Sequence, residues 1–298
     1  MLNKKKNRGI PLEASEKSMI VTSYIIMTIF ALCAILPILH VLSKAFSSAS
    51  AVTSGAVLFW PIDIQFETII YVLKETTFMN SLKNTVIVTV VGTIISMLVT
   101  ITTAYPLSKP SFKGRKFFIM LYIISMVFFG GIVPAYMVVR TLGIMDTFAA
   151  LILPFFIVHF NMFIVKNYFE GLPESIEESA KIDGASDIKI LVYIVCPMST
   201  PVLATVAMLY AVNYWNNYFH AVMYTNSTDM QTLQLFIYNT ISNTQTIVER
   251  LVAGNYANVS IDGIIAAVVV LSLIPIVAVY PLVQRYMVQG ITIGSVKG

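Results

Sequence analysis

Six long apolar runs constrain this chain of 298 residues more than any other feature. A helix needs roughly 20 consecutive apolar residues to cross the hydrocarbon core of a bilayer, and each run supplies about that number. A membrane-spanning strand would instead alternate apolar and polar residues. The sequence therefore predicts an all-α membrane protein with six transmembrane helices, at about residues 19–41, 84–105, 117–139, 147–165, 190–214 and 263–282.

Charge is scarce in this chain and absent from the interior of all six runs. Charged residues make up 11% of the sequence and hydrophobic residues 57%, whereas about 25% charged residues is usual in a soluble domain. An ionisable residue inside a membrane usually marks an ion path or a proton relay. Its absence argues against a carrier that is driven by protons or sodium through a carboxylate.

The sequence also lacks the glycine-rich Gly-x-x-x-x-Gly-Lys-Ser/Thr loop that binds nucleotide phosphates. Any ATP that drives this chain, with its Mg²⁺, must therefore bind a separate subunit, and we expect no cofactor in this chain. The cysteines, Cys33 and Cys196, belong to different apolar runs and show no metal-ligand spacing. Basic residues do not interleave with aromatic ones, so nucleic acid is not an expected partner.

The basic residues predict the orientation of the chain. On this map one face of the membrane carries 14 of the 19 basic residues, and the other carries Lys44, Lys74, Lys83, Arg140 and Arg250. Because basic residues gather in cytoplasmic loops, both termini are expected in the cytoplasm. The predicted organisation is a cytoplasmic tail at 1–18, a first helix and extracellular segment at 19–78, a core at 79–284, and a second cytoplasmic tail at 285–298.

A charged segment between the fourth and fifth runs has the features of a short helix. Pro173 suits the first turn of a helix, where its missing N–H costs nothing. Ile176 and Ala180 lie four residues apart and so share one face, and Gly184 is suited to the left-handed backbone that ends a helix. The acidic residues fall near the positive end of the helix dipole, at Glu174, Glu177 and Glu178.

Residues 178–197 resemble the EAA loop of ABC-importer permeases. Glu178-Ser179-Ala180 is followed by Asp183-Gly184-Ala185 and then by Ile194 and Pro197. Ser179 replaces the central alanine of the family motif, and Val195-Cys196 precedes Pro197 where leucine is usual. In the family this loop, here residues 173–197, docks into the ATP-hydrolysing subunit. The resemblance assigns that contact to Glu178, Ala180, Asp183 and Gly184.

The resemblance extends over most of the chain. The segments at 80–85 and 104–108 are similar to the start of the family's permease core. The C-terminal residues 290–298 and the triplet Trp215-Asn216-Asn217 are similar to the MalG-like branch that imports oligosaccharides. Within that branch the chain resembles the LplC/YtcP-like permeases of Gram-positive polysaccharide-utilisation systems.

The resemblance implies a heteromeric importer in which this chain is a non-enzymatic permease subunit. Its expected partners are a second homologous permease, two ATP-binding subunits, an extracellular solute-binding lipoprotein, a carbohydrate substrate and the lipid bilayer. The expected location is the plasma membrane of a bacterium, as a multi-pass protein. Two other classes stay open, namely a secondary carrier that works alone and a membrane scaffold without an ATPase partner.

Polar and aromatic residues gather at the end of the fifth run, at Tyr214, Trp215, Asn216 and Asn217. Aromatic rings stack on sugar faces, and amides bond to hydroxyl groups, so the cluster is a candidate lining for a substrate path. The same aromatic residues also mark membrane interfaces without any ligand. Consecutive helical residues point about 100° apart, so at most two of the four can face one path.

Three remaining features carry weaker signals. His40 closes the first run, and we expect it to bond to a carbonyl group at a helix end. His159 and Asn161, in the fourth run, are expected to hydrogen-bond between helices. The segments at about 42–83 and 215–262 have room for structure outside the membrane, and the second shows no strong helical period between residues 225 and 258.

Overall fold

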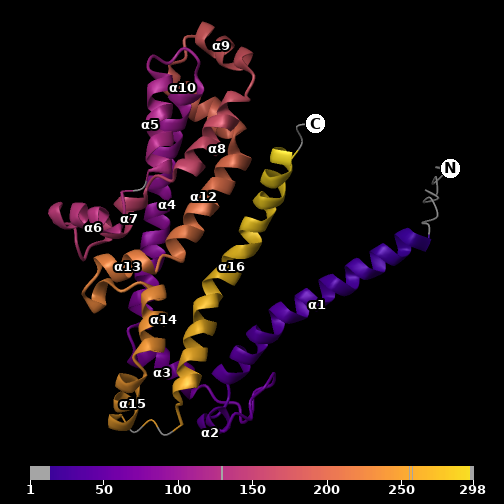
Figure 1. Cartoon of the computed structure of the whole chain (residues 1–298), viewed down its shortest axis with the longest axis vertical. Helices are drawn as coiled ribbons and strands as arrows, with labels where there is room; N and C mark the ends of the chain where they lie inside the picture. The colour runs from indigo at the N-terminus through magenta and orange to yellow at the C-terminus, as the bar shows by residue number, and fades with distance from the viewer. Residues whose placement is uncertain (1–13, 129, 255, 257, 296–298) are drawn as a thin grey trace. The chain divides into compact units, whose positions relative to one another are not determined.

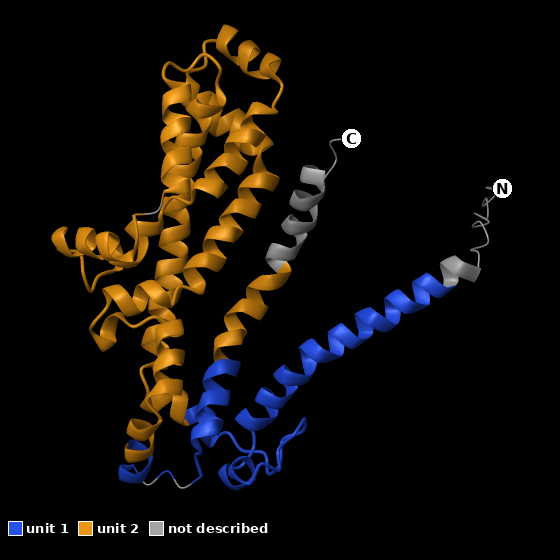
Figure 2. Cartoon of the chain, viewed as in Figure 1, with its two compact units in different colours: residues 1–70, 250–270 blue, residues 71–249, 271–298 orange. Residues whose placement is uncertain are grey.

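The structure is a computed structural model that describes residues 14–128, 130–254, 256 and 258–295, with side chains described from 18 to 281. All regular secondary structure in this part of the chain is helical (Figure 1), which confirms the all-α prediction. The chain divides into two compact units, Met1–Ile70 with Arg250–Val270 and Tyr71–Glu249 with Leu271–Gly298 (Figure 2). Each unit is described below by itself.

Three described helices are long and apolar enough to cross a membrane without interruption. Three further pairs of helices pass the same test together but are bent at a short break. If each bent pair is one span, the described residues contain up to six spans, in the order that the six apolar runs predict. The straight segments are Ser18–Ala45, Phe78–Ser108 and Ile261–Pro281; the bent pairs are Arg115–Val127 with Ile132–Thr141, Phe148–Phe155 with His159–Glu170, and Asp187–Met198 with Thr200–Trp215.

The straight helices are longer than their apolar runs. Helix α1 (Ala14–Ala45) begins inside the segment predicted as a tail, and α16 (Ile261–Ser295) continues past residue 282. Helix α4 (Phe78–Ser108) extends beyond 84–105 at both ends. Hydropathy follows the thickness of the hydrocarbon core, whereas backbone hydrogen bonds can continue a helix into the polar interface, and this difference accounts for the extra turns.

Twelve further helical elements are shorter; among the described residues, those within 148–155 and 187–198 belong to the bent pairs, and the others lie between the spans. They are α2 (Ala49–Thr53), α3 (Glu67–Glu75), α7 (Phe148–Ile152), η1 (Leu153–Phe155), α9 (Glu174–Ile182), α10 (Asp187–Ile190), η2 (Leu191–Val195), α11 (Cys196–Met198), α13 (Phe219–Tyr224), η3 (Thr228–Met230), α14 (Leu233–Ser242) and α15 (Thr244–Ala253). The remaining span helices are α5 (Arg115–Val127), α6 (Ile132–Thr141), α8 (His159–Glu170) and α12 (Thr200–Trp215).

The segment after Trp215 is more helical than its sequence indicates. It contains α13, α14 and α15, and the last two fall within residues 225–258, where the sequence shows no strong helical period. Helix α14 is held by tertiary contacts: Phe236 packs edge-on against Phe78 of α4 at 5.9 Å between ring centroids. The N–H of Leu233 donates to Thr85 Oγ1 of α4 at 2.7 Å. Such contacts stabilise a ten-residue helix whose own sequence pattern is weak.

Within the first unit, α1 leads into a compact hairpin-like segment that includes α2. His40 lies with Nδ1 2.7 Å from the carbonyl oxygen of Leu58, so the expected carbonyl bond is present. The expected position at a helix end is wrong, because α1 continues past His40 to Ala45. Lys44 forms an ion pair with Asp262 at 3.6 Å. Gln65 Nε2 donates to the carbonyl oxygen of Asn258 at 2.9 Å and thereby links the two chain segments of this unit.

The second unit is built around α4, against which α8 and α12 pack (Figure 1). Small side chains allow this close packing, as is usual between membrane helices. A Cβ atom on Gly92 of α4 would lie 2.7 Å from Cζ of Tyr214, so only glycine fits there. His159 Nε2 lies 2.8 Å from Ser125 Oγ of α5, which confirms the interhelical bond expected of His159. Asn161 is buried.

Two bends in the second unit have identifiable causes in the sequence. The fifth span bends by 86° at Ser199, between Pro197 and Pro201, which each remove a backbone donor. A π-helical turn, η2, precedes the bend. The fourth span bends by 53° after η1, which contains Pro154. α5 and α6, on either side of residue 129, meet at 113°.

Candidate functional site

The charged segment after the fourth span folds into α9, as its sequence predicts. Pro173 precedes the first turn with φ −61°, and Glu174 and Glu177 fall in that turn. Gly184 has φ +80°, the left-handed conformation expected of it. The N–H of Ala185 donates to the carbonyl oxygen of Ala180 at 2.9 Å and closes the end of the helix.

One face of α9 is anchored inside this chain and the other is open. Ala180 is 9% exposed and belongs to the apolar core of the second unit, and Glu177 is 8% exposed. Glu178, Asp183 and Gly184 are exposed. Of the four residues that the resemblance assigns to the ATPase contact, Ala180 therefore faces inward and the other three face outward.

An ion pair fixes the inner face of α9 to the end of α4. Glu177 accepts a hydrogen bond from Nζ of Lys109, and Lys109 Nζ lies 4.9 Å from the centre of the Tyr105 ring. A cation over an aromatic face is electrostatically attracted. The sequence indicated Glu177 only as a favourable charge at a helix start; its partner lies 68 residues away, so local spacing gave no signal for the pair.

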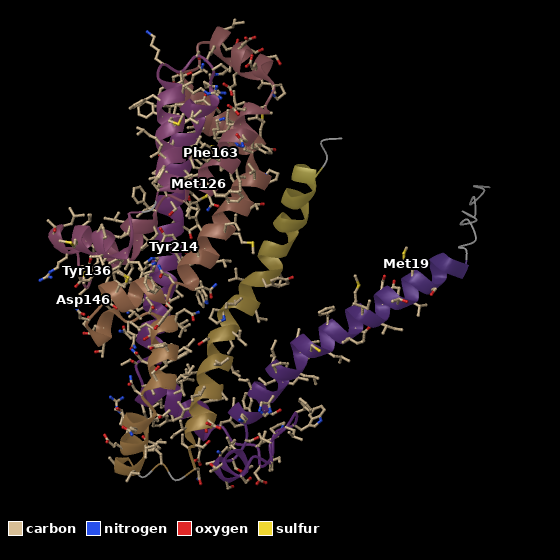
Figure 3. All side chains as sticks on the ribbon, in the orientation of Figure 1. Met19, Met126, Tyr136, Asp146, Phe163 and Tyr214 are labelled. Atoms are coloured by element: carbon tan, nitrogen blue, oxygen red, sulfur yellow. The ribbon has the colours of Figure 1, made fainter. Side chains whose placement is uncertain are left out.

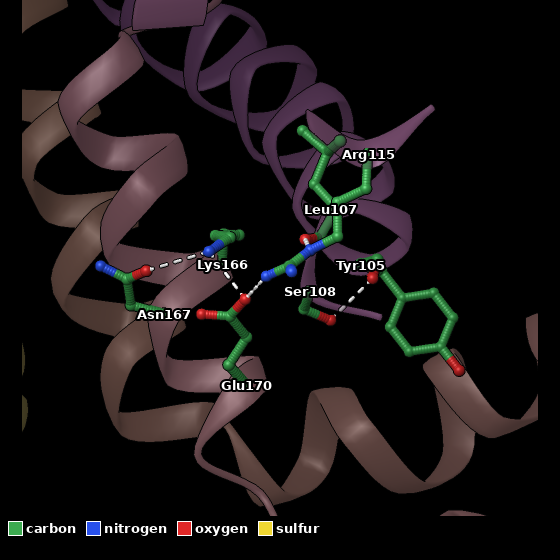
Figure 4. A network of polar contacts seen from close by, with 7 residues as sticks. All are labelled: Tyr105, Leu107, Ser108, Arg115, Lys166, Asn167 and Glu170. Carbon is green, nitrogen blue, oxygen red and sulfur yellow. Dashed lines mark hydrogen bonds and ion pairs between the residues drawn. The ribbon is translucent and has the colours of Figure 1, made fainter. Parts of the chain in front are cut away.

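A second ionic cluster holds the same ends of α4, α5 and α8 together (Figure 4). Glu170 pairs with Nη2 of Arg115 and, at 2.7 Å, with Nζ of Lys166. Arg115 Nε also donates to the carbonyl oxygen of Leu107 at 2.8 Å. Lys166 is 8% exposed, and its pairing with Glu170 compensates the cost of burying the charge. These contacts thus fix the ends of α4, α5 and α8 to one another.

Tyr214, labelled in Figure 3, lies in the core rather than on an open surface. It is 4% exposed. Its hydroxyl lies 2.9 Å from Ser96 Oγ and donates to the carbonyl oxygen of Ile152 at 3.3 Å. That carbonyl belongs to the broken fourth span, where helical bonding is interrupted, so Tyr214 serves the helix packing. It does not line an open path in this structure.

Tyr210, one turn earlier on α12, has the matching arrangement. Its hydroxyl lies 2.8 Å from Thr100 Oγ1 and accepts a hydrogen bond from the N–H of Val158 at 3.0 Å. Val158 precedes α8, where the first N–H groups have no helical partner. The two tyrosines therefore bond backbone groups on both sides of the break in the fourth span. Sequence reasoning did not identify this pair, because the partners lie on three different helices.

Two of the other three residues of the polar cluster contact the segment after α12. Asn216 Oδ1 accepts from Gln234 Nε2 of α14 at 3.5 Å, and Asn217 Oδ1 accepts from the N–H of His220 at 3.2 Å. Trp215 is half-buried, and its Nε1 has no hydrogen-bond partner among the described residues. The cluster thus separates into a core residue, Tyr214, an exposed residue, Asn216, and two half-buried residues, Trp215 and Asn217.

An aromatic stack stands beside this cluster. The ring of His220 stacks on Phe155 at 3.4 Å between centroids, and lies nearly parallel to Tyr224 at 6.1 Å. Burial lowers the pKa of His220 to about 4, because an apolar site disfavours the charged imidazolium. At neutral pH the stack is therefore uncharged.

A loop-to-loop contact closes the same end of the second unit. Asp146 has φ +58°, and its Oδ1 accepts from the N–H groups of Asn226 and Ser227 at 2.9 and 3.1 Å. These backbone bonds lower the pKa of Asp146 below its usual 3.8, because they stabilise the carboxylate. Within the described residues, no three histidine, cysteine or acidic side chains are grouped so as to hold a metal ion.

The described chain consists largely of apolar helices that are long enough to cross a membrane, singly or as bent pairs. An exposed charged helix, α9, lies between the fourth and fifth of these segments. This is the general design of a membrane permease. Residues 93–293 match the family described as "Binding-protein-dependent transport system inner membrane component". The chain belongs to this family. It is therefore a membrane component of a binding-protein-dependent ABC transport system, as the resemblance of residues 178–197 predicted.

Individual relatives agree with this assignment. Protein LplC of Bacillus subtilis (strain 168) is 40% identical over 269 residues, covering 89% of this chain and 90% of LplC. The polygalacturonan/rhamnogalacturonan transport system permease protein YtcP of the same organism is 36% identical over 286 residues, covering 94% and 98%. A crystal structure of a bacterial ABC transporter involved in the import of the acidic polysaccharide alginate contains a chain with a TM-score of 0.88 and 33% identity, covering 93% and 99%. The predicted likeness to LplC and YtcP is confirmed.

Proposed function

We propose that this chain crosses the bacterial plasma membrane six times, with both termini in the cytoplasm, as one permease of a carbohydrate importer. Three straight apolar helices and three bent pairs support the six spans. The placement of 14 of the 19 basic residues on one side supports the orientation. On this topology the tails are 1–18 and 285–298, the first helix with its extracellular segment is 19–78, and the permease core is 79–284. Residues 1–13 and 296–298 lie outside the described part.

The coupling role is supported by the difference between the two faces of α9, one of which is buried and the other exposed. Its inner face is fixed by Ala180 and by the ion pair of Glu177 with Lys109. Its outer face presents Glu178 and Asp183 next to Gly184, where a Cβ atom would meet nothing within 4 Å. A helix that is rigidly attached on one side and open on the other can transmit the motion of a partner to the spans. We assign that partner to an ATP-binding subunit.

The complete importer would contain a second homologous permease, two ATP-binding subunits that hold ATP and Mg²⁺, and an extracellular solute-binding lipoprotein. The carbohydrate cargo is supported by the names of YtcP and the alginate transporter. On the proposed topology Trp215, Asn216 and Asn217 lie at the outer end of the fifth span, where a sugar released from above would arrive. Tyr214 supports that end from within the core.

Reconstitution tests this proposal. The chain is co-purified with its second permease and ATPases, placed in proteoliposomes with ATP inside, and supplied outside with loaded binding protein and labelled oligosaccharide. Uptake should require both ATP and the binding protein, and should persist when ionophores collapse ion gradients. Uptake by this chain alone along an ion gradient would indicate the secondary carrier instead. No uptake, with a stable complex, would favour the scaffold.

Gly184→Asp tests the coupling surface within the same assay. It adds a Cβ atom and a charge at the open end of α9, so we expect transport to be lost and the ATPase to bind weakly. Gly143→Asp is a matched control, because Gly143 also has a positive φ, +68°, and open space around it, but lies in the loop between α6 and α7. The conformational cost is similar, and only the location differs. Equal behaviour of the two variants contradicts the coupling role.

A further inference from the structure

Four uncharged side chains form two adjacent contacts between the end of α12 and α14. The first contact joins the amides of Asn216 and Gln234 at 3.5 Å. The second joins the rings of Tyr218 and Tyr238, whose centroids lie 4.7 Å apart with 46° between their planes. Asn216 and Tyr218 are two residues apart, and Gln234 and Tyr238 are one helical turn apart on α14. The amide contact and the tyrosine contact therefore lie next to each other.

This amide–tyrosine surface, defined as Asn216, Tyr218, Gln234 and Tyr238, is open to a ligand. Tyr238 is 48% exposed, Asn216 is exposed, and Tyr218 and Gln234 are half-buried. Tyr238 therefore combines a ring contact with Tyr218 and an exposed surface. A tyrosine ring offers apolar contact area at low cost in side-chain entropy, with a hydroxyl at its tip.

The amides retain unused hydrogen-bonding capacity. A glutamine amide has two N–H donors and a carbonyl acceptor. Gln234 donates one N–H to Asn216 Oδ1, and its Oε1 has no partner among the described residues. Asn216 uses one N–H on the carbonyl oxygen of Val212 at 3.0 Å. A free acceptor and a free donor on one amide match two neighbouring hydroxyl groups, each of which donates and accepts.

We infer that the amide–tyrosine surface binds one sugar unit of the transported carbohydrate, with a ring face on Tyr238 and a pair of hydroxyl groups on Gln234. The surface carries no charge at neutral pH, so it suits the parts that all sugars share, namely ring faces and hydroxyl groups, rather than a carboxylate. Two of its four residues belong to α14. This inference rests on the proposed function and adds to it the contacting residues.

The experiment uses the complete importer with its binding protein. The probes are labelled maltopentaose, a neutral oligosaccharide, and labelled pentagalacturonate, an acidic one. Wild-type uptake first identifies the transported probe. Its binding to the vanadate-trapped complex is then measured for Tyr238→Leu and Gln234→Leu. We expect each variant to weaken binding about tenfold, the effect of losing one stacking contact or one hydrogen-bonded group.

Two variants separate ligand contact from damage to α14. Tyr238→Phe keeps the ring and should bind within about twofold of wild type, since only the hydroxyl is lost. Ile241→Ala changes another exposed side chain of the same helix, 51% exposed, and should leave binding unchanged. The complex must keep its size-exclusion profile in all variants. If Ile241→Ala weakens binding as much as Tyr238→Leu, the surface is structural and the inference is wrong.

The remaining outcomes are also decisive. If wild type transports neither probe, although its ATPase responds to the binding protein, both the sugar cargo and this surface are overturned. If wild type transports a probe and the two leucine variants bind it normally, only the surface is overturned. If those variants instead lose affinity for the empty binding protein, the surface is a protein-docking site and the inference is again overturned.

Discussion

The hydroxyl groups of Ser96 and Tyr214 lie 2.9 Å apart and join α4 to α12 inside the helix bundle. The same tyrosine hydroxyl donates to the carbonyl oxygen of Ile152, which belongs to the bent fourth span. A backbone group freed by a bend must find a partner, because no water is available in the apolar interior. Tyr214 supplies that partner and is itself oriented by Ser96.

Removing the Tyr214 hydroxyl should destabilise the helix bundle by a modest amount. Tyr214→Phe leaves the carbonyl of Ile152 without its donor, and we expect a loss of about 1 kcal/mol, since interhelical hydrogen bonds in membranes average roughly 0.6 kcal/mol and reach about 1.7. Unfolding of the purified chain is followed for Tyr214→Phe, Ser96→Ala and the double variant. Strict additivity of the two changes would show that the hydroxyls do not interact.

Gly92 is expected to tolerate no larger residue while Tyr214 is present. A Cβ atom there would lie 2.7 to 2.9 Å from three ring carbons of Tyr214, too close for any real contact. Gly92→Ala should therefore cost about 1–3 kcal/mol, as in other overpacked cores. The loss should shrink when Gly92→Ala is combined with Tyr214→Leu, which removes the ring. A Gly92→Ala variant as stable as wild type would contradict this packing.

Topology can be tested by cysteine labelling in a background that carries Cys33→Ala and Cys196→Ala. Cysteines at Ser111 and Ser186, both exposed, should react with a membrane-impermeant maleimide only from the cytoplasmic side. A cysteine at Asn226 should react only from outside. Asn226 is preferred to Ser227 because the hydroxyl of Ser227 donates to Asp146 at 3.1 Å. Labelling of Ser186→Cys from outside would refute both the orientation and the coupling role of α9.

The sequence predicted those helices whose signals lie within one short segment of the chain. The apolar runs located the spans because the bilayer demands continuous apolar helices. Helix α9 followed from Pro173, its acidic first turn and Gly184, all within one short segment. The sequence also contains prolines at 197 and 201, on either side of the bend of 86°. The size of that bend depends on how the flanking helical turns rearrange, and the sequence alone did not predict it.

Features that depend on distant partners were not predicted. Helix α14 is stabilised by Phe78 and Thr85 of α4, about 150 residues earlier in the sequence. The inward placement of Ala180 and Tyr214 likewise results from packing against other helices. The substrate role of residues 214–217 stays a prediction, and the burial of Tyr214 within that cluster required the tertiary structure.

Acidification should destabilise the end of the second unit that contains α13 through His220. Its pKa is about 4 in the folded chain, against an ordinary value of 6.5, so between these values the unfolded chain binds a proton that the folded chain does not. Stability therefore falls as pH drops from about 6.5 toward 4. Thermal unfolding in detergent from pH 7 to 4.5 measures the slope. His220→Phe keeps an aromatic ring against Phe155 and should reduce the dependence of stability on pH. An unchanged slope would assign the effect to other groups.

The ion pair of Lys109 and Glu177 should determine how firmly α9 follows the spans. Glu177→Gln keeps the shape of the side chain but removes its charge, so Lys109 is left half-buried without its partner. A hydrogen bond to a charged group contributes about 1.5–3 kcal/mol, and its loss should loosen the inner face of α9 while the exposed residues stay unchanged. We therefore expect the ATPase still to bind but transport per ATP hydrolysed to fall.

The charge-swapped pair Lys109→Glu with Glu177→Lys should recover part of that ratio, whereas each single reversal should lower it. If Glu177→Gln transports with the wild-type ratio, the ion pair serves stability alone and α9 is held by Ala180 and its apolar neighbours.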